Sequence, residues 1–179
     1  LNQDLVDRGE LRALYYSLKS NPPKFESHPA IRFVRLESLE QFYEWCHLFS
    51  KCYGIEEEIV DSCFRSVFDE GVCQLFLAQL YEKSVGCSAM YVDGDSALLL
   101  WDTVLPMYRR QGVGSMMVLS RMVSALDAGV ENVYTFAMDP MFGTYKSLGY
   151  AQFAKFNLLR FDPRLVSKKP EGKISDMEA

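Results

Sequence analysis

The stretch TVLPMYRRQGVGSMMV, residues 103–118, joins the end of an apolar strand to an apolar helix through a short basic loop. Gly112 and Gly114 have no Cβ, so the backbone there can approach a ligand closely. N–H groups at a helix start point outward, the helix dipole adds positive potential, and Arg109 and Arg110 strengthen it. These features indicate a site for a phosphate or diphosphate. The alternative is a solvated turn between a strand and a helix.

Two common nucleotide-binding motifs do not fit this loop. The sequence has no GxxxxGK[ST] pattern, which excludes a P-loop. It also has no GxGxxG followed by an acidic residue, which excludes a dinucleotide-binding fingerprint.

Length and composition indicate one globular domain. The chain has 179 residues, of which 49% are hydrophobic and 24% charged. Its formal net charge of −5 argues against a nucleic-acid partner bound through a broad basic face. No apolar run approaches the roughly twenty residues that span a bilayer, so we expect no membrane partner.

The cysteines and histidines favour a cytoplasmic protein without a metal. The five cysteines form no CxxC pair and are odd in number, and each lies in an apolar pattern. We therefore expect buried, reduced thiols in a cytoplasmic compartment. The two histidines have no metal-ligand spacing, so no metal site is expected.

Residues 1–30 are expected to form an N-terminal helix and a linker outside the main domain. The apolar positions at helical spacing are Leu5, Leu11, Leu14, Tyr15 and Leu18. An Asn-Pro-Pro run at 21–23 would stop this helix. Because the first residue is Leu, we expect the chain to be part of a longer protein, with residues 1–30 as the remnant of a preceding domain.

The main domain is expected to span residues 31–162, followed by a polar tail at 163–179. Strands, helices and turns are predicted from alternation, helical spacing and caps, including a capping box at Ser38 and Gln41. The predicted order is strand 31–36, helices 38–54 and 56–71, strands 72–82, 84–94 and 96–106, helix 113–128, strand 131–139, short helix 140–149 and strand 150–161. This order predicts an α/β (α+β) fold with a mixed, mostly antiparallel sheet flanked by helices.

Two motifs in register resemble the GNAT superfamily of N-acetyltransferases. The pattern Arg109-x-x-Gly112-x-Gly114 resembles the coenzyme A motif of that family, and YKSLGY at 145–150 resembles its Tyr-x-x-x-Gly-aromatic element. One helix and one strand separate the two motifs, as in the family. The element order from residue 31 to about 161 also fits the GNAT fold.

The resemblance implies acetyl-coenzyme A (acetyl-CoA) as co-substrate and a splay between the fourth and fifth strands, 96–106 and 131–139. Backbone N–H groups of the loop would hold the diphosphate. The matching positions are Arg110, Gln111, Gly112, Val113, Gly114 and Ser115, and Arg109 is a further cofactor-binding residue of the motif. The splayed fourth strand would pair with the pantetheine arm at Asp102 and Val104. The Asp102 N–H would then stabilise the oxyanion of a tetrahedral intermediate.

Tyr145 matches the tyrosine that commonly protonates the departing thiolate in this family. A phenol suits that task because it can donate a proton while neutral at pH 7. The alternative for Tyr145 is a packing aromatic on a short helix.

The general base is not evident. The positions that match the family's base are Leu98 and Leu100, which cannot accept a proton. Strand alternation places Leu98, Leu100 and Asp102 on one face. Asp102 is therefore a candidate base, a ligand for the acceptor's ammonium group, or a strand-end Asp bonded to backbone. A water relay to Glu82 or Asp139 is a further alternative.

Taken together, the sequence predicts an acetyl-CoA-dependent N-acetyltransferase that acts on a primary amine by direct attack. A small-molecule amine is the first choice of acceptor and a peptide or protein amine the second. Glu56, Glu57 and Glu58 favour a cationic acceptor or form a solvated helix start. The alternative function is a catalytically silent domain that binds coenzyme A. The protein partners considered are a second copy of the chain, in a homodimer, and a preceding domain of the parent protein.

Overall fold

The structure is a computed structural model that describes residues 5–26, 28–139 and 141–161. It is built on one seven-stranded sheet of order β2-β3-β4-β5-β6-β1-β7. The strands are β1 (Leu5–Ser17), β2 (Ile31–Arg35), β3 (Gln74–Leu80), β4 (Lys83–Asp93), β5 (Ser96–Val104), β6 (Asn132–Ala137) and β7 (Ala151–Phe161). The helices are α1 (Leu39–Tyr53), α2 (Glu57–Asp69), the 3₁₀ helix η1 (Pro106–Tyr108), α3 (Val113–Asp127) and α4 (Met141–Ser147).

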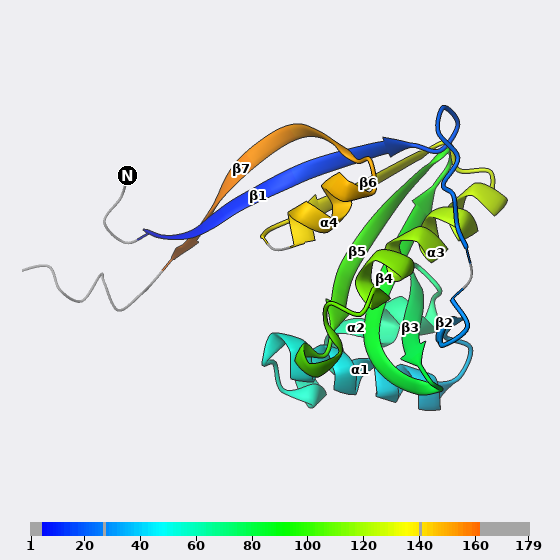
Figure 1. Cartoon of the computed structure of the whole chain (residues 1–179). Coiled ribbons are helices and arrows are strands. Elements are labelled where there is room, and N and C mark those ends of the chain that lie inside the picture. The colour runs from blue at the N-terminus through cyan, green and yellow to red at the C-terminus, as the bar shows by residue number, and fades with distance from the viewer. Residues whose placement is uncertain (1–4, 27, 140, 162–179) are drawn as a thin grey trace, which may run out of the picture.

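Only β5 and β6 pair in parallel among these strands, and the other neighbours are antiparallel. The predicted mixed, mostly antiparallel sheet flanked by helices is therefore confirmed. Helices cover both faces of the sheet (Figure 1). Leu75 and Leu77 of β3 pack with α1, whereas Phe76 between them packs with α3 on the opposite face. This alternation along β3 divides the core into two layers.

The two helices after β2 form where the sequence predicted them. Ser38 accepts a hydrogen bond from the Gln41 N–H, and the Gln41 side chain accepts one from the Ser38 N–H. This capping box satisfies N–H groups that would lack partners at the helix start. Gly54 then ends α1 in the left-handed conformation, with φ of 67°.

The prediction of an N-terminal helix is wrong, because residues 5–17 form strand β1 inside the sheet. β1 pairs with β6 along Arg12–Ser17 and with β7 along most of its length. Leu14, Tyr16 and Leu18 are buried, which is the two-residue period of a strand. The hydrogen bonds that favour this strand come from residues more than 100 positions away, so local spacing did not reveal them. β1 thus belongs to the same sheet as the expected main domain.

Strand β5 is bulged where it leaves β6. The β5–β6 pairing covers Ser96–Leu99 and stops there, so the predicted splay is present. On the other side, the register with β4 shifts between Leu100 and Thr103. Trp101 has a φ of 55°, a left-handed conformation that is costly for a bulky side chain.

The prediction that Leu98, Leu100 and Asp102 share one face is also wrong, because of this bulge. Leu100 and Trp101 both pack toward α1 and α2, whereas Asp102 contacts α3 and α4 on the other face. Two successive residues on one face reset the alternation of the strand. The side chain of Asp102 is therefore directed away from the face expected from a regular strand.

The remaining expectations are met in part. All five cysteines are free, but only Cys46 and Cys87 are buried, whereas Cys52 and Cys73 are half-buried and Cys63 is exposed. No helix in the described part of the chain is long and apolar enough to cross a membrane. The predicted polar tail at 163–179 lies outside the described residues.

β4 and β5 pack closely at Gly86, beside the bulge, and a substitution there tests this contact. A Cβ at Gly86 would lie 2.6 Å from the Thr103 carbonyl oxygen and 3.3 Å from Val104 Cγ2. We expect Gly86→Ala to lower the free energy of unfolding by about 1–3 kcal/mol, because backbone atoms must move. Gly143→Ala is the control, since a Cβ there meets no atom within 4 Å. Equal denaturation midpoints for both variants would contradict this packing.

Candidate active site

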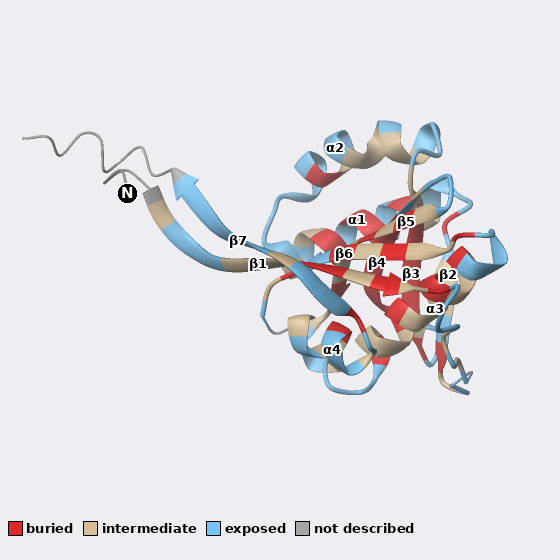
Figure 2. Cartoon of the chain, turned by 90° about the horizontal axis from the view of Figure 1, so that it is seen from above, coloured by how far each residue is buried: buried red, intermediate tan, exposed pale blue. Residues whose placement is uncertain are grey.

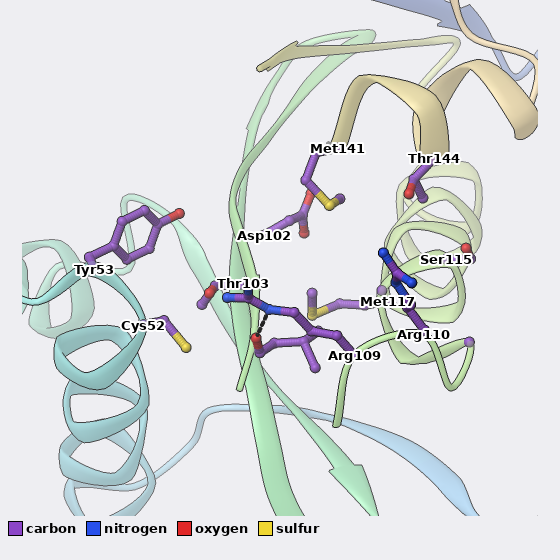
Figure 3. A pocket seen from close by; sticks show the side chains of 13 residues that line it. Cys52, Tyr53, Asp102, Thr103, Arg109, Arg110, Ser115, Met117, Met141 and Thr144 are labelled. Atoms are coloured by element: carbon purple, nitrogen blue, oxygen red, sulfur yellow. Dashed lines mark hydrogen bonds between the residues drawn. The ribbon is translucent and has the colours of Figure 1, made fainter. Parts of the chain in front are cut away.

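A cavity of about 610 Å³ opens where β5 separates from β6 (Figure 3). Its walls come from the end of α1, from β5, from the loop before α3, from the first turn of α3 and from α4. The lining residues are Cys52, Tyr53, Asp102, Thr103, Val104, Arg109, Arg110, Gly112, Gly114, Ser115, Met117, Met141 and Thr144.

The loop that the sequence singled out forms one end of this cavity. Gly112 is the N-cap of α3 with φ of 81°, and it provides no side-chain cap. The first N–H groups of a helix have no partner within the helix, so those of Val113, Gly114 and Ser115 are positioned for an anion. A Cβ at Gly112 or Gly114 would meet no atom within 4 Å. The glycines therefore leave room in the cavity rather than relieving a clash.

The two arginines have different positions. Arg109 Nε donates a hydrogen bond of 2.8 Å to the Val104 carbonyl, which ties the loop to the splayed end of β5. Arg110 is exposed at the cavity with φ of 60°, a left-handed conformation. Both therefore place positive charge beside the first turn of α3.

Two of the predicted loop residues do not line the cavity. The Gln111 side chain donates to the Met107 carbonyl at 3.3 Å, and Val113 is buried in the core with Met117. Their predicted contribution to diphosphate binding is through backbone N–H groups, and it stays a prediction.

Asp102 lies at the cavity wall and is held from behind by two buried residues. Arg121 of α3 donates to Oδ1 of Asp102, and the Tyr145 hydroxyl donates to Oδ2. The exposed fraction of the side chain is 1% for Arg121 and 6% for Asp102. Tyr145 is 2% exposed and is not a lining residue. The two predicted catalytic residues are thus in contact, with Asp102 between Tyr145 and the cavity.

Arg121 also holds the bulge of β5. Its Nη1 donates to the carbonyl of Ala89 at 2.7 Å and lies 3.5 Å from that of Leu100, and its Nε donates to Met117 at 3.2 Å. Ala89 and Leu100 form the last regular β4–β5 pair before the bulge. The guanidinium therefore connects α3, β4 and β5 at the point where strand alternation fails.

Sequence reasoning missed Arg121, although a signal was present. It lies four residues after Met117 and four before Ala125, both buried on the apolar face of α3. A lone charge on an apolar face needs a buried partner of opposite sign. Asp102 is that partner.

Burial controls the protonation of this group of residues. Burial raises the pKa of Asp102 above its usual 3.8, and the charge of Arg121 and the hydrogen bond from Tyr145 lower it in part. Burial, followed by the negative charge of Asp102, raises the pKa of Tyr145 well above its usual value. Tyr145 therefore remains protonated at neutral pH and can act as a donor.

The acids considered for a water relay, Glu82 and Asp139, and those considered for acceptor binding, at 56–58, are not at the cavity wall. Asp139 is 74% exposed and pairs with Arg12 at 3.4 Å. Neither Glu82 nor the acids at 56–58 are among the lining residues. Asp102 is the only carboxylate that lines the cavity within the described part of the chain.

Comparison with known proteins relies on solved structures, since no family profile and no curated protein matches the sequence. A GCN5-related N-acetyltransferase from Kribbella flavida superposes on 89% of the chain with a TM-score of 0.65 and 16% identity. A tandem GNAT protein from the clavulanic acid biosynthesis pathway covers 84% with a TM-score of 0.67 and 14% identity. The chain has the GNAT fold. An aminoglycoside acetyltransferase from an uncultured soil metagenomic sample, solved in complex with sisomicin, also has this fold. It matches 66% of the chain and 87% of its own length, with a TM-score of 0.57 and 20% identity.

The chain is shorter than several proteins that share its fold. It spans 60% of the Kribbella flavida protein and 52% of the tandem GNAT protein.

Arg121→Met tests the buried ion pair. Leaving Asp102 buried without its partner should cost about 3–5 kcal/mol of folding free energy at pH 7. In the folded variant the pKa of Asp102 should be higher still than in the unaltered protein, because the charge of Arg121 no longer lowers it. The loss of stability should therefore shrink as the pH falls toward 4, because protonation removes the unpaired charge. Denaturant unfolding across this pH range measures both effects.

The control for this prediction is the double variant Arg121→Met with Asp102→Asn. It should recover a large part of the lost stability at pH 7, because no buried charge remains. A double variant as unstable as Arg121→Met alone would show that the loss reflects packing rather than charge.

Proposed function

We propose that this protein is an acetyl-CoA-dependent N-acetyltransferase that transfers an acetyl group to a primary amine. The observation that carries the proposal is the cavity, which has a helix N-terminus and two arginines at one end and a splayed strand with Asp102 along its wall. The proposed anion site and the unpaired edge of β5 thus line the same cavity.

The phosphate end fits the diphosphate of coenzyme A. The open space at Gly112 and Gly114 lets phosphate oxygens reach the N–H groups of the first turn of α3. Arg110 faces the same space and adds a positive charge (Figure 3). When bound there, acetyl-CoA supplies an activated thioester.

The splayed part of β5 fits the pantetheine arm. Beyond Leu99 the strand has no partner on the β6 side among the described residues, so its backbone on that side is not used by the sheet. Val104 and Asp102 are the positions proposed to pair with the arm. The Asp102 N–H is the proposed donor to the thioester oxygen, where negative charge develops during transfer.

Asp102 and Tyr145 are proposed to move protons as a connected pair. Asp102 is the carboxylate at the cavity wall, so it is the proposed acceptor of a proton from the amine. Tyr145 stays protonated and donates to Asp102 from behind the cavity wall, so the proposed proton path from Tyr145 to the departing thiolate runs through the Asp102 carboxylate. The C–N bond forms as the C–S bond breaks, and the proton lost by nitrogen balances the one gained by sulfur.

A small-molecule amine is the proposed acceptor. The aminoglycoside acetyltransferase with the same fold was solved with a small molecule, sisomicin. In this chain Cys52 and Tyr53 line the side of the cavity away from Arg110 and Ser115 (Figure 3), and like Met141 they are uncharged. A compact amine with an apolar part suits that wall, and acetylation of a peptide or protein amine is the alternative.

A silent coenzyme A-binding domain is a second candidate. The observation in its favour is that the Tyr145 hydroxyl is bonded to Asp102 and buried behind the cavity wall. Binding without turnover would follow if that hydrogen bond persists when the thioester is bound.

Gly114→Leu tests the binding site without straining the backbone. Gly114 does not have a positive φ, and its missing Cβ points into open space. We expect affinity for acetyl-CoA to fall at least about 100-fold, because the side chain occupies the phosphate position. Gly143→Leu on the exposed side of α4 is the matched control and should bind normally. Unchanged affinity in a folded Gly114→Leu variant would refute the site.

Tyr145→Phe tests the catalytic role of the hydroxyl. Turnover, followed by thiol release with an amine acceptor, should fall about 100-fold or more while the affinity for acetyl-CoA stays the same. Tyr150→Phe is the control, because that hydroxyl is equally buried and has no hydrogen-bond partner among the described residues. Equal turnover of both variants would remove Tyr145 from the mechanism, and binding without any turnover in the unaltered chain would favour the silent domain.

A further inference from the structure

Strands β1 and β7 continue past the body of the protein as a two-stranded ribbon (Figures 1 and 2). β6 pairs with Arg12–Ser17 of β1, so residues 5–11 pair with β7 alone. We call residues 5–11 and 156–161 the ribbon. Two strands without a third strand or a covering helix are at best marginally stable in water. The ribbon therefore lacks the support that the rest of the sheet has.

β7 is the outer strand of the sheet and carries exposed apolar side chains. Phe153 is 62% exposed and Phe156 is 51% exposed, and Leu158 and Leu159 are also exposed. A long edge strand with unpaired backbone groups is a template for pairing with another strand. Exposed apolar residues that are grouped along such an edge mark an interaction surface.

The sequence of β7, AQFAKFNLLRF, is self-complementary about Phe156. When two identical strands pair antiparallel about a two-fold axis, residues equally distant from the axis face each other. With Phe156 on the axis, the facing pairs are Phe156 with Phe156, Lys155 with Asn157, Ala154 with Leu158, Phe153 with Leu159 and Gln152 with Arg160. Apolar residues face apolar ones, polar face polar, and no like charges meet.

Neighbouring registers lose this match. An axis at Asn157 would place Lys155 opposite Leu159 and Ala154 opposite Arg160. An axis at Lys155 would place the two copies of Lys155 opposite each other, and like charges directly opposite destabilise a pair. The register is thus selected by charge as well as by apolar contact.

We propose that two copies of this chain associate through β7, with Phe156 on the two-fold axis. The two sheets become one continuous sheet of local order β1-β7-β7-β1, and each ribbon gains a third strand from the partner. β7 is bulged against β1 at Phe153, between the pairs of Ala13 and Leu14, and its register with β1 shifts again between Asn157 and Leu159. The regular stretch Ala154–Asn157 therefore forms the centre of the contact. No residue of β7 lines the cavity, so this interface is independent of the proposed function.

Phe156→Glu tests the interface by placing two negative charges together at the axis. The unaltered chain should sediment as a dimer at micromolar concentration, and the variant should be a folded monomer, with its dimer dissociation constant raised at least about 100-fold. Phe136→Glu on β6 is the control, since Phe136 is 49% exposed but lies outside β7. The proposal would be overturned if the unaltered chain were monomeric even at a concentration 100-fold above micromolar. It would also be overturned if the Phe156→Glu variant remained dimeric.

Cysteine pairing tests the register itself, in a Cys63→Ser background that removes the exposed thiol. Side chains directly opposite each other in antiparallel strands have Cβ atoms about 4.5–5.5 Å apart, close enough for oxidation to a disulfide with slight adjustment. Phe156→Cys should therefore cross-link to itself. Leu158→Cys should not, because its two copies would lie about 13 Å apart along the strands. A mixture of Ala154→Cys and Leu158→Cys chains should cross-link, whereas efficient self-linking at 158 but not at 156 would overturn this register.

Discussion

The buried ion pair between Arg121 and Asp102 is the interaction on which the candidate site depends. Removing two charges from water is costly, and the cost is repaid only when both are paired and hydrogen-bonded. Here the guanidinium bonds to Asp102 and to the carbonyls of Ala89 and Met117, and Tyr145 bonds to the second carboxylate oxygen. This arrangement fits only when Asp102 is on the α3 side of β5. The left-handed Trp101 is therefore the local distortion that the ion pair holds in place.

One continuous segment of chain builds both ends of the cavity. β5 supplies the wall that carries Asp102, and the next residues form the loop and the first turn of α3, where an anion can bind. The hydrogen bond from Arg109 to the Val104 carbonyl joins the two ends. Arg121, two turns further along α3, then returns to Asp102. Displacing any one of these contacts would change the distance between the proposed phosphate site and the proposed reacting atoms, which is the distance that a rigid site must fix.

Local signals in the sequence predicted much of the fold and the loop. The Ser38 capping box, the glycines of the loop and the alternation of the central strands depend on neighbouring residues, so they can be recognised without the tertiary structure. β1 could not be assigned in this way, because its strand conformation depends on hydrogen bonds to β6 and β7. The predicted orientation of Asp102 was also wrong, since a bulge resets the alternation of β5 and the residue that pairs with Asp102, Arg121, lies on another element. Nonlocal partners thus account for the main errors.

The most direct measurement is a calorimetric titration of the chain with acetyl-CoA, with free coenzyme A as the comparison. If the helix N-terminus and the arginines hold the diphosphate, both ligands should bind with similar, micromolar dissociation constants, because that contact is common to both. Absence of binding at millimolar concentrations of either ligand would contradict the account. The loop at 109–115 would then be a basic turn at the start of α3, and the GNAT fold would serve another purpose in this chain.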